Sequence, residues 1–121
     1  MKRLTVTIPG APVPASRPRV TRNGTYNAPR YKQWLSDASW WLRAGAIDQL
    51  GAVPMWTEPV SVTLTFCGAR KNADIDNLQK GVFDAMQQAG VIVDDKQVIR
   101  VAAWKVEGKP QSTTVTVEVV E

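Results

Sequence analysis

The spacing of apolar residues changes between Val60 and Gly90, and this change constrains the fold more than any other feature of the chain. From Val60 to Phe66, apolar residues alternate with serine and threonine, as in a strand with one buried face. After the loop CGARKNA, apolar residues recur every three or four positions, at Leu78, Val82, Ala85, Met86 and Ala89. This spacing predicts an amphipathic helix that ends at Gly90. A strand is therefore expected to lead through a short loop into a helix.

The sequence on either side predicts three further strands and a second helix. Strands are expected at Leu4–Ile8, Val98–Val106 and Thr113–Val120, and a helix at Tyr31–Leu50. Together these elements predict an α+β fold, in which two main helices pack on a four-stranded mixed sheet. No repeat or linker divides the chain, so residues 1–121 are expected to form a single domain.

Residues 9–30 are too rich in proline and glycine to form a long helix or strand. The stretch holds five prolines and two glycines. Within it, Asn23-Gly24 is typical of a tight turn, so a small hairpin is expected between Val20–Arg22 and Thr25–Tyr26. The stretch is also basic, and such a loop suits contact with a polyanion.

Positive charge is concentrated in the first half of the chain. Residues 1–50 carry eight basic and two acidic side chains, a net charge of +6, whereas the whole chain carries +4. Residues 51–121 therefore carry −2. This asymmetry favours a surface for nucleic acid in the first half, although many basic domains bind none.

The composition excludes several classes of site. The single cysteine, Cys67, rules out an internal disulfide, and the absence of histidine rules out imidazole chemistry and His-ligated zinc. Any metal would be bound mainly by oxygen. No apolar run approaches the roughly 20 residues of a membrane span, and no secretory signal is evident, so a cytoplasmic protein without a membrane partner is expected.

Acidic residues lie at both ends of the second predicted helix. Asp76, with Gln79 three positions later, is typical of a helix cap, whereas Asp74 has no such role in this interpretation. Asp94 and Asp95 follow the apolar run after Gly90, where a solvated turn is the plain alternative. Taken together, the carboxylates form a candidate set of oxygen ligands for a hard divalent ion such as Mg²⁺.

Basic residues accompany these acids. Lys80 lies one helical turn after Asp76, either as an ordinary surface partner of that carboxylate or as a cation for the charge that develops on a phosphate. Arg70 and Lys71 directly precede the acids and could hold a phosphate backbone.

The segment D-I-D-N-L-Q-K-x-x-F-D-A-x-x-x-A-G-x-x-x-D-D-x-Q-V, from Asp74 to Val98, resembles the signature of the RusA family of Holliday-junction resolvases of bacteria and their phages. The resemblance covers roughly Val60 to Val106, about two fifths of the chain. It implies a Mg²⁺-dependent endodeoxyribonuclease, with Mn²⁺ as a substitute, that acts as a homodimer in DNA recombination and repair. Such an enzyme resolves a four-way junction by paired symmetric nicks.

By position, the resemblance assigns the catalytic residues. It implies three catalytic acids that bind the metal, with Asp94 as an additional ligand beside them, and one essential lysine; these are Asp74, Asp76, Asp95 and Lys80. For DNA contacts, the candidates are the basic side chains of the loop and of the segment before the acids: Arg17, Arg19, Arg22, Arg30, Lys32, Arg70 and Lys71. Trp40 lies off the apolar stripe of the first helix and is a candidate for the dimer interface.

Two alternatives remain from the sequence: a module that binds branched DNA without cleaving it, and a nuclease that prefers flaps or forks. The metal hypothesis also carries a structural expectation. The chain after Gly90 must fold back so that Asp95 lies beside Asp74 and Asp76, with Asp84 outside the site.

Overall fold

The computed structural model describes residues 2–16, 19–21, 24–26 and 29–121, with side chains for residues 2–16 and 29–121. The helices are α1 (Pro29–Leu50) and α2 (Ile75–Ala89), with a short 3₁₀ turn, η1 (Asp95–Gln97). The strands are β1 (Arg3–Pro9), β2 (Arg19–Thr21), β3 (Gly24–Tyr26), β4 (Val60–Cys67), β5 (Val98–Val106) and β6 (Ser112–Val119). Every helix and strand expected from the sequence is present, and the small hairpin is confirmed as β2 and β3.

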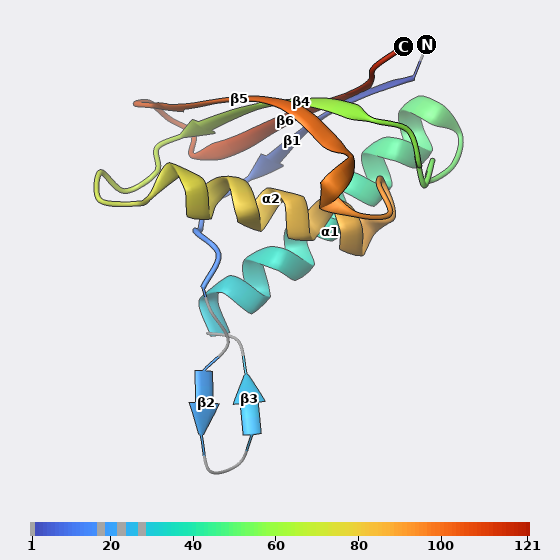
Figure 1. The fold of residues 1–121 in the computed structure, drawn as a ribbon. Helices are drawn as coiled ribbons and strands as arrows, with labels where there is room; N and C mark the ends of the chain where they lie inside the picture. The colour runs from blue at the N-terminus through green and yellow to red at the C-terminus, as the bar shows by residue number, and fades with distance from the viewer. Residues whose placement is uncertain (1, 17–18, 22–23, 27–28) are drawn as a thin grey trace.

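The main sheet has four strands in the order β1-β6-β4-β5. Strand β6 runs antiparallel to both β1 and β4, whereas β4 and β5 are parallel, so the sheet is mixed as expected. Both helices cover the same face of this sheet, and the β2–β3 hairpin projects away from it (Figure 1). The parallel pair requires a crossover, which α2 supplies.

The core lies between the sheet and the two helices. Alternate residues of β4 are buried, from Val60 to Phe66, as are the apolar residues that give α2 its helical period. Gly45 lets α1 lie close to β1, because a Cβ at this position would lie only 2.5 Å from Val6. A Cβ at Gly81 of α2 would lie 3.4 Å from Trp34 and Tyr31 of α1, an ordinary packing distance.

The expectation for the start of α2 is wrong by two residues. Asp74, not Asp76, is the N-cap: its backbone is extended and its side chain accepts a hydrogen bond from the Asp76 N–H. The helix therefore begins at Ile75, whose partly buried side chain packs against the core. The sequence interpretation gave the cap to Asp76 and no such role to Asp74, whereas the structure starts the helix two residues earlier and packs Ile75 against the core. At the other end, Gly90 is left-handed and ends the helix as expected.

Neither helix of the described residues is long and apolar enough to cross a membrane.

Candidate active site

Asp74 and Asp76 come together at the N-terminus of α2. The Asp74 carboxylate accepts the Asp76 N–H at 2.8 Å, and both side chains are exposed. The positive end of the helix dipole favours negative charge at this position. Two carboxylates therefore share one exposed helix terminus at little electrostatic cost.

The loop that leads into α2 is fixed by a lysine from β5. The Lys105 Nζ donates to the carbonyl oxygens of Lys71 and Ala73, at 2.9 Å and 2.8 Å. These bonds join the C-terminal end of β5 to the residue directly before Asp74. Nothing in the local sequence around Lys105 indicated this role, because the contact spans more than thirty residues of chain.

Asp74 lines a small pocket together with two arginines. Arg30, at the start of α1, and Arg70, in the loop before α2, line this cavity of about 320 Å³ with Asp74 and Asn77. The backbone of Asn77 accepts a hydrogen bond from the Ala15 N–H at 2.8 Å, which attaches the segment after β1 to α2. A carboxylate and two guanidinium groups around one cavity suit a phosphodiester that is also bound to a cation.

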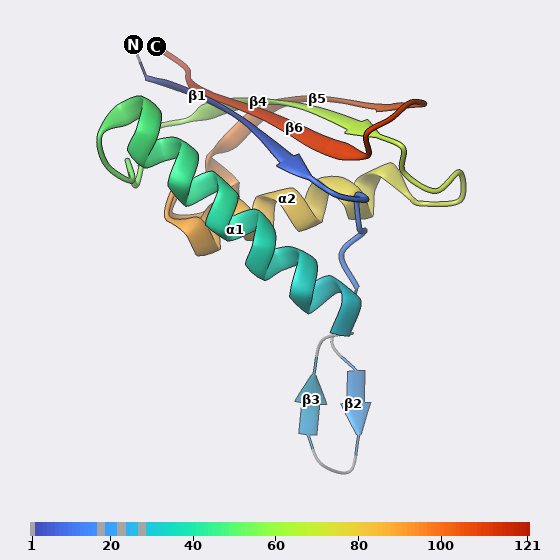
Figure 2. The ribbon, with the colours of Figure 1, turned by 180° about the vertical axis from the view of Figure 1, so that it is seen from behind.

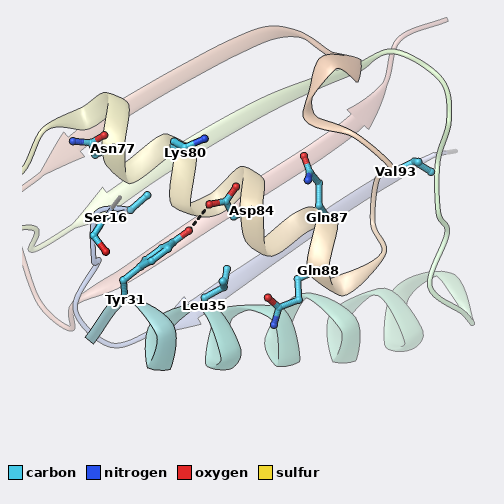
Figure 3. Close-up of a pocket in the computed structure, with 10 residues that line it drawn as sticks. Ser16, Tyr31, Leu35, Asn77, Lys80, Asp84, Gln87, Gln88 and Val93 are labelled. Carbon is cyan, nitrogen blue, oxygen red and sulfur yellow. Dashed lines mark hydrogen bonds between the residues drawn. The ribbon is translucent and has the colours of Figure 1, made fainter. Parts of the chain in front are cut away.

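A larger pocket continues along α2 from Asn77 (Figure 3). It has a volume of about 770 Å³ and shares Ala15, Ser16 and Asn77 with the smaller one. Lys80 lines it and makes no salt bridge with any described residue, so the alternative of a surface pair with Asp76 is not formed. The Lys80 ammonium group is therefore available to an anion in the groove.

Asp84 lines the same pocket but is already bound. The Tyr31 hydroxyl donates to its carboxylate at 2.5 Å. Burial, with the neighbouring Asp84 as the second cause, raises the pKa of Tyr31 above its usual range. The pair joins α1 to α2 across the groove. Apart from the position of Tyr31 on the apolar stripe of its helix, no sequence pattern indicated this contact.

Asp94 and Asp95 lie near the other end of α2. Asp94 caps η1 by accepting the Lys96 N–H, and the Gln97 side-chain oxygen accepts the Asp94 N–H. The Asp95 N–H donates to the Gln87 side chain at 2.7 Å. The chain does fold back onto α2, but only as far as Gln87.

The expectation that Asp95 lies beside Asp74 and Asp76 is wrong for a single chain. Gln87 follows Asp76 by eleven residues, which is about 16 Å along a helix. In the part of the chain that the structure describes, no three histidine, cysteine, aspartate or glutamate side chains are placed to hold a metal ion. Asp84 also stays outside the Asp74–Asp76 pair, since its carboxylate is bound to Tyr31.

The basic residues that are candidates for DNA contacts fall into two sets, those whose side chains the structure describes and those whose side chains it does not. Arg30, Lys32, Arg70 and Lys71 have exposed side chains, and two of them line the pocket of Asp74. Arg17 and Arg22 lie outside the described residues, and Arg19 begins β2 without a described side chain.

Comparison with known proteins assigns this chain to a family. The family described as Endodeoxyribonuclease RusA matches residues 9–119. The chain belongs to the RusA family. A protein from Aquifex aeolicus (strain VF5), named crossover junction endodeoxyribonuclease RusA, is 32% identical over 111 residues, which cover 87% of this chain and 82% of that protein. The resemblance expected from the sequence is thus confirmed, and the chain is an endodeoxyribonuclease of the RusA type.

Proposed function

We propose that this RusA-family endodeoxyribonuclease resolves four-way DNA junctions by paired nicks in a reaction that requires Mg²⁺. The observation that supports this most strongly is the pair Asp74 and Asp76 on the N-terminus of α2, beside a pocket that Arg30 and Arg70 also line. The substrate is proposed from the Aquifex aeolicus relative, whose name specifies crossover junctions.

The side chains at this site supply some, but not all, of the carboxylate ligands that a hard cation would use. Asp74 and Asp76 would supply two carboxylates, the ligands that Mg²⁺ prefers, and both are exposed to water that can fill other positions. Bound there, the ion would polarise a phosphate and lower the pKa of a coordinated water. Among the described residues of the chain, no third carboxylate lies close enough to Asp74 and Asp76 to complete a set of three ligands.

The basic side chains near Asp74 would have two different roles toward a bound substrate. Arg30 and Arg70 would hold a phosphodiester in the pocket that includes Asp74, since guanidinium groups bind phosphate oxygens in pairs. Lys80, one turn further along α2, would place its charge near the phosphate oxygens where negative charge increases during attack.

The test is a cleavage assay on a synthetic four-way junction with and without Mg²⁺ or Mn²⁺. We expect the parent to cleave it only with the metal, and Asp74→Asn to bind the junction with similar affinity without cleaving it. Cleavage by Asp74→Asn at near the parental rate would refute the metal role of this carboxylate.

Competition among branched substrates separates the alternatives. A flap, a replication fork and linear duplex are offered beside the junction at equal concentration. Preference for the flap or fork would show a nuclease of different specificity. Binding of the junction without metal-dependent cleavage of any substrate would show a binding module.

A further inference from the structure

The loop between β4 and α2 leads the backbone to Asp74, and its two halves are held in different ways. At its start, the Gly68 N–H donates to the carbonyl oxygen of Val106 at 2.9 Å. Among the described residues, the hydrogen bonds that reach residues 71–73 from another element all come from one side chain, that of Lys105. Hydrogen bonding between the rest of the molecule and the half of the loop next to Asp74 therefore relies on Lys105.

Lys105 lies on the face of the sheet that the helices cover. It pairs with Phe66 of β4, whose side chain is buried in the core, and paired residues of neighbouring strands point to the same face. The turn after β5 and the loop before α2 lie at the same end of the sheet in both views (Figure 1 and Figure 2). The aliphatic part of Lys105 can therefore extend along this face to the loop while the residue stays exposed to water.

The bond from Lys105 to Ala73 acts on the backbone of Asp74. The Ala73 carbonyl oxygen belongs to the peptide group that joins Ala73 to Asp74. This group is planar, so the 2.8 Å bond to its oxygen also fixes the direction in which the Asp74 backbone begins. On the other side, the Asp74 carbonyl oxygen accepts the Leu78 N–H at 3.0 Å. Both peptide groups that flank the Asp74 Cα are thus held, one by α2 itself and one by Lys105.

We propose that Lys105 is a positioning residue for the metal ion that Asp74 would bind, an inference that rests on the proposed function. By fixing the peptide group before Asp74, its ammonium group keeps the carboxylate in the orientation that a cation needs at the N-terminus of α2. Side chains of such a site have to be held within about 0.5 Å of their productive positions. Removal of a group that orients a metal ligand typically weakens metal binding by about 10- to 100-fold.

Two other roles are open to a lysine at this place, and each predicts a different result. A contact with a DNA phosphate predicts weaker junction binding when Lys105 is lost, with metal binding unchanged. A purely structural role predicts lower stability, also with metal binding unchanged. The two carbonyl oxygens already occupy two of the three N–H groups of the ammonium, which leaves one for a phosphate.

Three substitutions separate these roles. Lys105→Met removes the donor and keeps an unbranched apolar side chain. Lys105→Arg keeps a cation with several N–H donors, which can bond both carbonyl oxygens, so it should restore most of what methionine loses. Lys109→Met is the matched control, because it removes an exposed lysine from the turn between β5 and β6 that makes no side-chain hydrogen bond with another described residue.

Trypsin tests the loop without metal or DNA. Its sites after Arg70 and Lys71 lie in this loop, and the Lys71 carbonyl oxygen, which belongs to the second scissile peptide bond, is the one that Lys105 holds at 2.9 Å. Cleavage of a folded chain requires local opening. Since hydrogen bonds from a charged donor are lost, we expect Lys105→Met to be cut at these two bonds about tenfold faster than the parent. Lys105→Arg and Lys109→Met should stay near the parental rate, with fragment masses identifying the bonds.

Metal affinity tests the positioning role itself, at a temperature where all variants are folded. Binding of Mn²⁺, followed through the paramagnetic resonance signal of the free ion, should weaken about tenfold in Lys105→Met and recover in Lys105→Arg. In junction cleavage, the Mg²⁺ concentration that gives half the maximal rate should rise by a similar factor, whereas the rate at saturating Mg²⁺ should stay near the parental value. A residue that only stabilises the fold would not shift this concentration.

Three results would overturn the proposal. Unchanged trypsin cleavage of Lys105→Met would show that the loop is held without this lysine. Faster cleavage with unchanged Mn²⁺ affinity would make Lys105 a structural anchor alone, and weaker metal-free binding of the junction with unchanged Mn²⁺ affinity would make it a DNA contact. If the parent binds no Mn²⁺ and cleaves no junction, the proposed function fails instead, and trypsin still decides whether Lys105 orders the loop.

Discussion

Asp74 has two separable roles, and two substitutions at this residue distinguish them. Its carboxylate accepts the Asp76 N–H at 2.8 Å, which stabilises the start of α2. Asparagine caps a helix about as well as aspartate, whereas alanine has no acceptor and costs about 1 kcal/mol. Loss of the negative charge near the helix dipole adds about 0.3 kcal/mol to both variants at an exposed position.

These free energies convert into a measurable difference in Tm. The entropy of unfolding is about 2.1 cal/mol/K per residue, so a 121-residue domain changes its Tm by roughly 4 °C per kcal/mol. Asp74→Asn should therefore melt about 1 °C below the parent, and Asp74→Ala about 5 °C below. Thermal unfolding followed by circular dichroism measures both shifts.

Catalysis should respond in a different pattern from stability. If Asp74 binds the metal, both variants lose junction cleavage by on the order of a hundredfold or more at a temperature where both are folded. Asp48→Asn, which removes an exposed carboxylate from α1, is the matched control and should keep the parental rate. Equal losses of Tm for the two Asp74 variants would refute the cap, and retained cleavage by Asp74→Asn would refute the ligand.

Further predictions concern the groove and the helix contacts. Lys80→Ala should lower the cleavage rate more than the affinity for the junction, and an equal loss in both would mean that Lys80 only holds phosphate. Tyr31→Phe should cost about 1–2 kcal/mol at pH 7 in urea unfolding; because the pKa of Tyr31 is raised above 10.0 in the folded state, the parent's advantage should shrink as the pH rises above that value. Gly81→Ala should raise stability by up to about 1 kcal/mol, since its Cβ meets atoms no closer than 3.4 Å. Gly45→Ala should lower it by about 1–3 kcal/mol, because its Cβ would lie 2.5 Å from Val6.

The sequence predicted the elements of this fold because their apolar spacing is regular. Strand β4 alternates strictly, and α2 keeps one apolar face over its whole length. Helix caps were harder to predict, because Asp74 and Asp76 have the same chemistry and differ only in which one leaves Ile75 against the core. That choice depends on tertiary packing, which local spacing does not encode.

Contacts between residues that are far apart in the chain could not be predicted from the sequence either. The bonds from Lys105 to the loop before α2, and from Tyr31 to Asp84, join residues more than thirty positions apart. Gln97 belonged to the recognised motif without an assigned role. Its side chain accepts from the Val93 and Asp94 N–H groups and donates to the carbonyl oxygens of Trp56 and Glu58. A motif residue can therefore be structural.

The direction of β5 explains why the acids of one motif separate. In a strand–helix–strand unit with parallel strands, the helix begins at the end where the first strand stops, and the second strand begins at the other end. Asp74 follows β4 and Asp95 precedes β5, and these strands are parallel, so α2 stands between the two acids.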